Sequence, residues 1–405
     1  MMKNWLLMFL LGAPGFVHAG DAPSGVPAST NVRGAHYPQV LADRRVVFSI
    51  KAPDANSVKF RIGKDYVASR DEDGTWTAIT DALTPGFHYY WLVMDDVALT
   101  DPGSETFFGT GKQTSGIEIP ESGNEGNYYS PQVVPHGEVR ERWYRSKVTG
   151  EWRRFFIYAP PGYDHKLDQR YPVLYLQHGG GEDERAWVIQ GRVNHIMDNL
   201  IASGKAMPML VVMDQGYARR PGEAEVPLGP PRGLFNAKPG DPPPAAFPPE
   251  FSRMFSAFEE VVLQDLIPYV DATYRTIPNR DNRAIAGYSM GGMQAFMIGL
   301  RHTDTFSAIG GLSGAGGGFG DGSIDPNQYF GGVLKDADAF NAKMRLIFLG
   351  LGTEEPERIL NGVRGYHGAL KRQGIEHVYY ESPGTGHEWL TERRNLRELA
   401  SHLFR

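Results

Sequence analysis

A serine between glycines, Ser289 in the pattern G-x-S-x-G at residues 287–291, is the first candidate for chemistry in this chain. The apolar run at 283–286 predicts a buried strand, and residues 290–300 predict a helix directly after it. A serine on a tight turn between a strand and a helix exposes its Oγ and has the helix N-terminus beside a developing oxyanion. We therefore predict that Ser289 is a nucleophile for acyl transfer. The alternative is a structural glycine-rich turn, because the pattern is short.

A serine hydroxyl needs a base to become nucleophilic, and the base needs an acid to orient it. In a strand–serine–helix arrangement of this kind the chain order is serine, acid, histidine. Five histidines follow Ser289, and only His387 lies in a glycine-rich loop, residues 383–389, just after an apolar run at 377–380. The sequence predicts His387 as the base. The alternative is that His387 is an ordinary surface-loop histidine without a catalytic role.

The acid must come between Ser289 and His387, near the carboxyl end of a strand. The apolar run 346–349 is followed by a glycine-rich stretch that ends in Glu354 and Glu355. The pattern does not separate these two candidates. Four aspartates in a Gly- and Asp-rich connection are weaker candidates: Asp321, Asp325, Asp336 and Asp338.

An oxyanion formed by attack on a carbonyl group needs two backbone N–H donors. Met290 follows the nucleophile and supplies one. The second is expected from Q-H-G-G-G at 177–181, which follows a predicted strand at 173–176, with Gly180 favoured and Gly181 next. A hydrogen bond that stabilises this loop is the expected role of His178. A phosphate-binding loop is the rival interpretation, but the lysine and hydroxyl residue it requires are missing.

Alternating strands and helices must position these residues. From residue 135 onward short apolar runs alternate with helical stretches, which predicts a mostly parallel sheet with helices on both faces. Together with the serine turn this predicts an α/β-hydrolase fold at 135–405. The expected strands are 155–158, 173–176, 209–213, 284–286, 308–312 and 346–349, and the expected helices are 193–203, 257–274, 290–301 and 358–373. Residues 217–249, rich in Pro and Gly, are either a surface insertion or a rim over the active site.

A different pattern precedes this domain. Runs rich in β-branched and aromatic residues at 46–50, 58–62, 76–79 and 88–93 are separated by turn residues, and they predict a small immunoglobulin-like β-sandwich at 20–118. Residues 119–134 are predicted to be a linker.

The N-terminus has the pattern of a signal peptide at 1–19: Lys3, an apolar run at 5–11, and small residues for cleavage near Ala19. The apolar run is shorter than the ~20 residues of a membrane span, so we expect a secreted or periplasmic protein rather than a membrane protein. The chain has no cysteine, which excludes disulfides and thiol chemistry. A net charge of −6 without a basic run argues against nucleic acid as a partner. No cofactor and no metal ligands are predicted.

The combined motifs resemble carbohydrate esterase family 1, which includes feruloyl esterases and acetyl xylan esterases. The segments that carry the resemblance are 135–140, 171–181, 198–202, 265–269, 286–292 and 386–389. The resemblance implies that Glu355 is the acid, where the family more often has Asp. It also implies hydrolysis of feruloyl esters on plant cell-wall xylan or its oligosaccharides through an acyl-enzyme. Acetyl-ester hydrolysis, acyl transfer and an inactive carbohydrate-binding protein are the alternatives.

Two further expectations follow from this resemblance. The N-terminal β-domain resembles family 48 carbohydrate-binding modules, although their starch-binding tryptophans and lysine cannot be assigned to Trp76, Trp91 or Lys64. Polysaccharide binding and a packing role at the active-site rim both stay open. A planar acyl group needs an apolar slot, and Trp187, Tyr288 and Trp389, next to the motifs, are candidates to line it or to pack in the core.

Overall fold

The computed structural model describes residues 25–225, 228, 249–315, 325 and 328–405. The predicted signal peptide and its cleavage site near Ala19 lie outside these residues, as do Asp321 and most of the Pro-rich stretch 217–249. Within the described part of the chain, no helix is long and apolar enough to cross a membrane.

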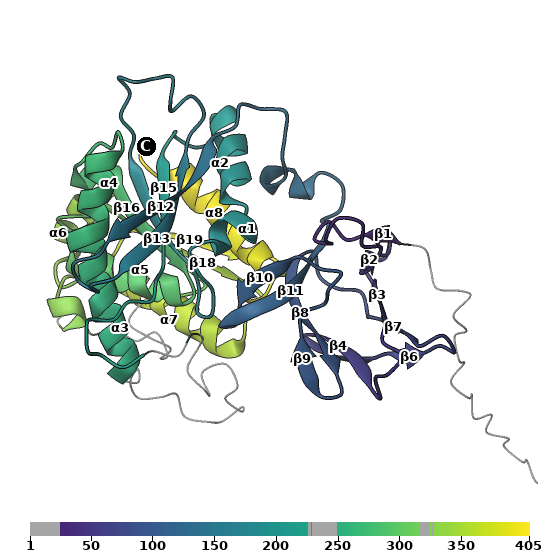
Figure 1. Ribbon diagram of the computed structural model, residues 1–405. Coiled ribbons are helices and arrows are strands. Elements are labelled where there is room, and N and C mark those ends of the chain that lie inside the picture. Colours follow the sequence, from purple (N-terminus) through teal and green to yellow (C-terminus); the bar gives the residue numbers. More distant parts are fainter. Residues whose placement is uncertain (1–24, 226–227, 229–248, 316–324, 326–327) are drawn as a thin grey trace, which may run out of the picture.

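The N-terminal part consists of two antiparallel sheets (Figure 1). Phe48 of one sheet stacks on Phe60 of the other, with ring centroids 4.4 Å apart, so the two sheets enclose a common core. The first sheet has the order β1 (Val26–Pro27), β2 (Gln39–Val40), β3 (Val46–Lys51), β7 (Thr75–Ile79) and β6 (Ser69–Arg70). The second has the order β10 (Thr106–Gly109), β11 (Lys112–Ile119), β8 (Gly86–Met94), β4 (Val58–Ile62) and β5 (Lys64–Val67), and β9 (Val97–Leu99) pairs with β8.

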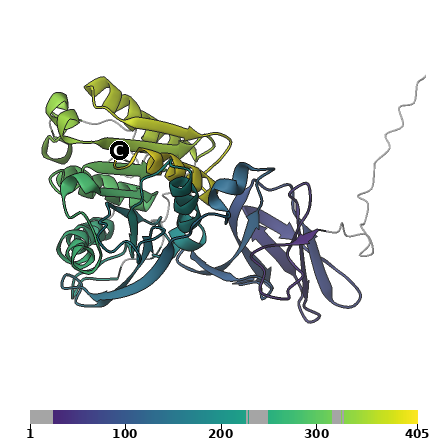
Figure 2. The ribbon, with the colours of Figure 1, turned by 90° about the horizontal axis from the view of Figure 1, so that it is seen from above.

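The C-terminal part is built on one eight-stranded sheet (Figures 1 and 2). Its order is β12 (Glu138–Arg145), β13 (Trp152–Ala159), β15 (Leu210–Asp214), β14 (Val173–Gln177), β16 (Arg283–Tyr288), β17 (Ala308–Leu312), β18 (Leu346–Gly352) and β19 (Val378–Ser382). The pairs β12–β13 and β13–β15 are antiparallel and all the others are parallel. The predicted fold class, an all-β part followed by a mostly parallel α/β-hydrolase sheet, is confirmed.

Helices cover both faces of this sheet because its strands are apolar on both sides. In β14, Leu174 and Leu176 face one core, while Val173 and Tyr175 face the other. The first core also contains residues of α1 (Ala186–Ile189), α2 (Val193–Ala202) and α8 (Trp389–His402). The second contains residues of α3 (Pro249–Glu260), η3 (Val261–Leu266), α4 (Ile267–Thr273), α5 (Met290–Arg301), α6 (Ala337–Lys343) and α7 (Glu357–Gln373).

The edge strand β12 was not predicted from the sequence. Its residues are E-V-R-E-R-W-Y-R, and only Tyr144 is buried. Charged residues on an exposed edge strand discourage pairing with other chains, and they also remove the apolar run by which a strand is recognised.

The N-terminal part packs against the C-terminal part through apolar and polar contacts, and Phe87 and Phe107 belong to the same core as Leu390 of α8. Arg393 of α8 forms a bidentate ion pair with Glu118 of β11, with N–O distances of 2.7 and 3.0 Å. The Gly111 N–H donates to the Gly181 carbonyl oxygen at 2.8 Å. The segment predicted as a linker contains a short 3-10 helix, η2 (Glu125–Tyr129), and the Asn199 side chain of α2 donates to backbone carbonyl oxygens of this segment.

The parallel strands bring the candidate residues to one edge of the sheet. In the register of the sheet, Gln177 pairs with Gly287, and Leu312 pairs with both Tyr288 and Gly350. The loops that leave the carboxyl ends of β14, β16, β17, β18 and β19 therefore meet at this edge, and in such sheets ligands bind at that edge.

Candidate active site

Ser289 occupies a strained turn between β16 and α5. Its φ of 52° and ψ of −113° lie outside the regions that a residue with a side chain prefers. The glycines around it are required because a larger residue would not fit. A Cβ on Gly287 would lie 2.4 Å from the Gly291 carbonyl carbon, and a Cβ on Gly314 would lie 2.1 Å from the Ser289 backbone carbonyl oxygen. The turn can close only with these glycines: Gly287 belongs to the pattern predicted from the sequence, whereas Gly314 follows β17 and was not predicted.

Ser289, His387 and Glu355 form a hydrogen-bonded chain. His387 Nε2 lies 3.0 Å from Ser289 Oγ, and His387 Nδ1 lies 2.7 Å from Glu355 Oε2. Glu355 is 4% exposed, whereas Glu354 is exposed, and its one hydrogen bond to another described residue is from its backbone N–H to the Thr385 carbonyl oxygen. Of the two candidate acids, the structure places Glu355 beside the imidazole. The order nucleophile, base, acid is the one that activates a serine for acyl transfer.

A second carboxyl group, Glu392 of α8, lies behind Glu355 and was not predicted. The Ser313 hydroxyl oxygen lies 2.6 Å from Glu392 Oε1 and also contacts Glu355 Oε1. Burial raises the pKa of Glu392 well above its ordinary value, and the nearby charge of Glu355 adds to this effect. Ser313 has a single proton and cannot donate to both carboxyl groups at once. A protonated Glu392 that donates to Ser313, which in turn donates to Glu355, satisfies all three groups.

Met290 directly follows the serine, and the glycine loop with the second candidate donor follows β14, the strand that pairs with β16. Met290 is the first residue of α5, so its N–H precedes the hydrogen-bond ladder of the helix. In the loop after β14, the Gly179 N–H donates to Glu182 Oε2 at 3.2 Å and the Gly181 N–H donates to the Tyr217 hydroxyl at 2.6 Å. Among the described residues the Gly180 N–H has no acceptor. Gly180, rather than Gly181, is therefore the donor left for a substrate.

His178 stabilises the glycine loop after β14 through hydrogen bonds of its ring. Its Nε2 accepts a hydrogen bond from the Gly216 N–H at 2.9 Å, so the proton is on Nδ1, which lies 2.8 Å from the Gly179 carbonyl oxygen. Burial lowers the pKa of His178, which keeps the ring neutral. The contacts are those of the loop-stabilising role expected from the sequence.

All three aromatic residues considered for an acyl slot belong to one buried core. Trp187 and Trp389 are 1% and 2% exposed, and their indole N–H groups donate to the Gln177 carbonyl oxygen and to Glu182. Tyr288 is 7% exposed, with its ring centroid 5.0 Å from that of His387. The burial and hydrogen bonds of the two tryptophans favour the packing role that the sequence left open for them.

Glu182 links the two parts of the chain at the site. It accepts hydrogen bonds from the Tyr89 hydroxyl of β8 at 3.0 Å, from Trp389 Nε1 at 3.0 Å and from the Gly179 N–H at 3.2 Å. Burial raises the pKa of Glu182 to about 7. The position of Glu182 directly after the glycine run could have suggested a role, but no sequence signal marks Tyr89 as its partner.

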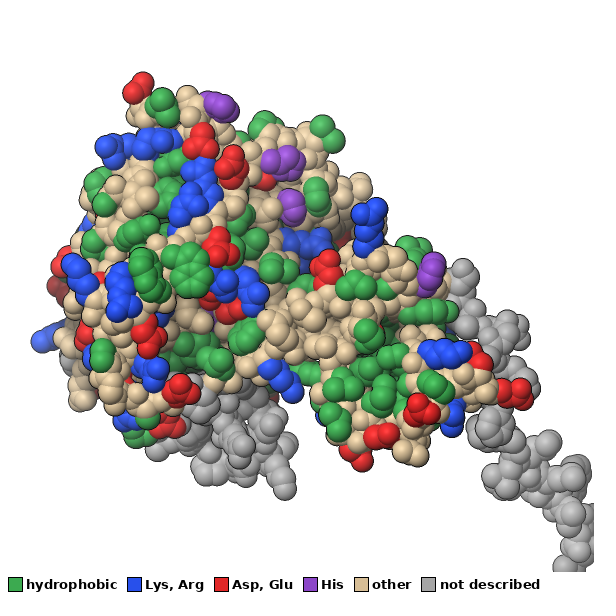
Figure 3. Space-filling model, viewed as in Figure 1, with side chains coloured by type: hydrophobic (Ala, Val, Ile, Leu, Met, Phe, Trp, Pro, Cys, Tyr) green, Lys and Arg blue, Asp and Glu red, His purple; other side chains and the backbone are tan. Residues whose placement is uncertain are grey.

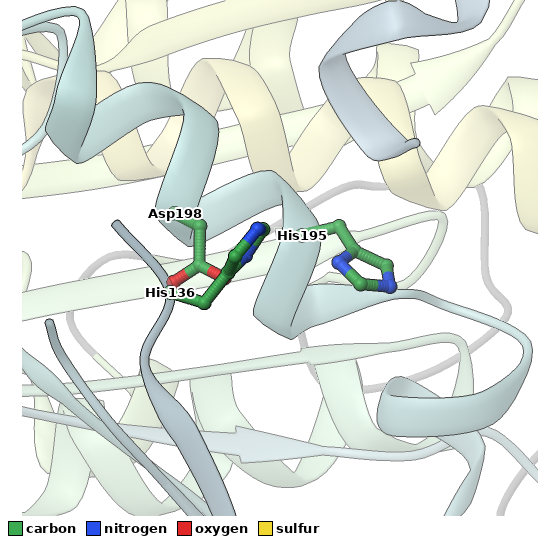
Figure 4. Close-up of side chains that lie close together, drawn as sticks. All are labelled: His136, His195 and Asp198. Carbon is green, nitrogen blue, oxygen red and sulfur yellow. The ribbon is translucent and has the colours of Figure 1, made fainter. Parts of the chain in front are cut away.

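One group of potential metal ligands, also absent from the sequence predictions, occurs in the described part of the chain: His136, His195 and Asp198 (Figure 4). Both ring nitrogens of His136 already face oxygen atoms, Asp198 Oδ2 at 2.8 Å and the Gln132 carbonyl oxygen at 3.0 Å. A metal ion would have to displace these hydrogen bonds. The group lies at the start of β12, at the opposite edge of the sheet from Ser289, so it cannot take part in chemistry at the serine.

Comparisons with known proteins agree with this geometry. Residues 146–317 match the model of the family described as "Putative esterase". The chain is 36% identical over 389 residues to an endo-1,4-beta-xylanase/feruloyl esterase of Xylanibacter ruminicola, and the match covers 94% of this chain. It covers 47% of that relative, so the chain spans about half the length of the curated protein it matches.

Two solved structures are similar as well. A CE1 ferulic acid esterase from Anaeromyces mucronatus, in complex with ferulic acid, has a TM-score of 0.54 and 26% identity over 68% of this chain and 94% of its own. The enterobactin esterase of Shigella flexneri has a TM-score of 0.59 and 17% identity over 88% of this chain and 92% of its own, a likeness of fold alone. The chain therefore has the α/β-hydrolase fold, and its C-terminal part is a carboxylic ester hydrolase domain similar to the CE1 feruloyl esterases.

Proposed function

We propose that the protein hydrolyses hydroxycinnamoyl esters, feruloyl esters above all, on plant cell-wall xylan. The observation that carries this proposal is the hydrogen-bonded chain from Ser289 through His387 to Glu355, with distances of 3.0 and 2.7 Å. The similarity to a xylanase/feruloyl esterase over 94% of the chain supports the choice of acyl group and polysaccharide.

The proposed reaction has two halves. His387 Nε2 takes the proton of Ser289 Oγ while Oγ attacks the ester carbonyl, and the Met290 and Gly180 N–H groups stabilise the oxyanion. The imidazolium then gives its proton to the departing sugar hydroxyl, which leaves a feruloyl group on Ser289. Water, activated by the same imidazole, attacks this acyl-enzyme and releases ferulate.

Glu355 orients the imidazole and stabilises its positive charge during both halves. Because Glu355 is buried, its position depends on the groups around it. Ser313 and a neutral Glu392 supply one hydrogen bond to Glu355 without a second negative charge beside it. We infer that this neutral carboxyl group keeps the acid in place.

The N-terminal part supports the active-site loops in this proposal. Tyr89 contacts Glu182, and the Gly111 N–H donates to the Gly181 carbonyl oxygen. Whether the part also binds carbohydrate, as its resemblance to family 48 modules implies, is tested by retention of the Ser289→Ala protein on insoluble starch. Export through the predicted signal peptide at 1–19 would bring the enzyme to its polymeric substrate.

Three esters test the proposed function: methyl ferulate, acetylated xylan and p-nitrophenyl acetate, with the Ser289→Ala variant as control. We expect ferulate release from the first, abolished by the variant, and little acetate release from acetylated xylan. Acetate release without ferulate release would overturn the acyl preference. Hydrolysis by the Ser289→Ala protein at the wild-type rate would overturn the mechanism.

A further inference from the structure

A cavity of about 540 Å³ opens beside the active-site loops. Its lining includes Trp143 of β12, Trp152 of β13, and Gln215 and Tyr217, which follow β15. Arg145 pairs with Trp152, and Phe155 pairs with Asp214, so the end of β12 and the start of β13 lie at the carboxyl end of β15. Because β15 is parallel to β14 and β16, the cavity and Ser289 share one edge of the sheet.

The cavity begins where the oxyanion loop ends. Its lining residue Tyr217 accepts the hydrogen bond from the Gly181 N–H, and Glu184, three residues beyond Gly181, also lines it. In the sheet order, β12 is four strands from β16, and neighbouring strands lie about 4.8 Å apart. The far end of the cavity is thus roughly 20 Å from the serine strand. That is too far for the acyl group itself but within reach of a polymer that carries the ester.

Exposed aromatic side chains mark this cavity. Trp143 is 50% and Trp152 is 62% exposed, whereas the other described tryptophans are buried or half-buried. Large exposed apolar side chains that gather at a concave site indicate a binding surface. The face of a sugar ring presents C–H groups that can lie flat on the electron-rich face of an indole. The two tryptophans therefore offer stacking surfaces for sugar units.

Polar and charged groups also line the cavity. Arg154 lies over the Trp143 ring at 5.6 Å and donates to Glu184 Oε1 at 2.5 Å. Glu184 is 4% exposed, and among the described residues its Oε2 has no hydrogen-bond partner. Within the described part of the chain, the lining contains three arginines and three glutamates whose charges balance, which favours a neutral polymer over a polyanion. The face over β12 and β13 shows hydrophobic, basic and acidic side chains side by side (Figure 3).

We propose that this cavity is a subsite for a neutral polysaccharide, which holds the xylan main chain on Trp143 and Trp152 while its ester enters the active site. The inference rests on the proposed function and adds to it a place where the polymer binds. In this arrangement the active site binds the acyl group, and the cavity binds the sugar chain.

Trp143→Ala, Trp152→Ala and the double variant test the subsite on two substrates. Methyl ferulate has no sugar chain, and a feruloylated xylo-oligosaccharide has one. We expect KM for the oligosaccharide to rise about 10-fold or more in the double variant, equivalent to at least ~1.4 kcal/mol, with kcat/KM for methyl ferulate unchanged within about twofold. Phe at both positions should restore much of the oligosaccharide activity, because a flat ring remains. Leu167→Ala, an exposed residue beyond the other end of β13, is the matched control.

The outcomes separate the two proposals. If the wild-type protein hydrolyses neither ester, the proposed function fails. If it hydrolyses both, and the double variant changes both rates equally or changes neither, the subsite is wrong. Titration of the wild-type protein with unesterified xylohexaose gives a second readout. We expect tryptophan fluorescence to change on binding, and Kd to rise about 10-fold in each single alanine variant. Unchanged Kd values would contradict the subsite.

Discussion

Glu355 and Glu392 contact the same hydroxyl group, that of Ser313, so that a single hydroxyl group bridges two carboxyl groups behind the histidine. One of the two carboxyl groups must be protonated, because Ser313 can donate one hydrogen bond and must receive the other. Glu355 is the one that contacts His387, and we assign the proton to Glu392. Burial raises the pKa of Glu392, and the charge of Glu355 adds to this effect, so the protonated form of Glu392 is favoured.

A neutral Glu392 should be replaceable by glutamine. In Glu392→Gln the side-chain amide can donate to Ser313 while its oxygen accepts from Asn395, so we expect kcat within about threefold of wild type. Glu392→Ala leaves Ser313 without its donor, and loss of such supporting contacts typically costs ~10–100-fold. Steady-state kinetics on methyl ferulate gives both values. Equal losses in kcat for the glutamine and alanine variants would show that Glu392 acts as a carboxylate.

The two neighbouring glutamates offer a matched pair. Glu355→Gln removes the carboxylate that contacts His387 Nδ1, and we expect kcat to fall by about 10²–10⁴-fold, as for a triad acid. Glu354→Gln changes the same chemistry one residue away, on an exposed side chain, and should stay within about twofold. Similar losses of kcat in the two variants, or a larger loss of kcat in Glu354→Gln, would show that Glu355 is not the acid that orients His387.

Glu182 should make stability depend on pH. Its pKa is about 7 in the folded protein and near 4.5 in an unfolded chain. Between these values the folded state binds more protons, so the contribution of Glu182 to stability is lost as pH rises from about 4.5 to 7. Glu182→Gln does not titrate. Relative to this variant, the wild-type free energy of unfolding should fall by about 3 kcal/mol between pH 4.5 and 8.

Urea unfolding of both proteins at several pH values measures this difference directly. A gap between wild type and Glu182→Gln that stays constant from pH 4.5 to 8 would mean that Glu182 titrates in the folded protein as it does in the unfolded chain.

Asp198 should matter for stability and not for catalysis. Its carboxylate is 1% exposed and accepts hydrogen bonds from the Gly137 N–H and the Tyr158 hydroxyl, and it contacts His136. Asp198→Ala leaves these donors unpaired, and we expect a loss of about 3 kcal/mol in the free energy of unfolding. The kcat on methyl ferulate should stay near wild type, because Asp198 lies at the other edge of the sheet.

His195→Ala is the control. His195 lies one helical turn from Asp198, but the hydrogen bonds of the Asp198 carboxylate go to other residues. We expect its free energy of unfolding to change by less than about 0.5 kcal/mol. If His195→Ala destabilises the protein as much as Asp198→Ala, the three side chains act as one unit, as they would around a bound metal ion.

Local patterns made much of this molecule predictable from its sequence. Ser289 and its glycines lie within five residues whose backbone geometry dictates their types, and His387 follows a strand in a short loop. Glu392 and Ser313 are 79 residues apart, and Glu182 and Tyr89 are 93 apart, so only the packed structure brings each pair together. The roles of Trp187 and Trp389 could not be assigned from the sequence. A sheet covered on both faces buries aromatic residues close to an active site, and proximity in sequence does not distinguish a residue that lines the substrate pocket from one that packs in the core.

A trapped intermediate tests the central claim most directly. Methyl ferulate is mixed with the wild-type protein and quenched in acid within milliseconds to seconds, and the protein is then digested and analysed by mass spectrometry. We predict a peptide that contains Ser289 and carries the mass of one feruloyl group, absent from the Ser289→Ala protein. Ferulate release by wild type with the adduct on another residue, or Ser289→Ala turnover at the wild-type rate, would contradict the assignment of Ser289 as the nucleophile.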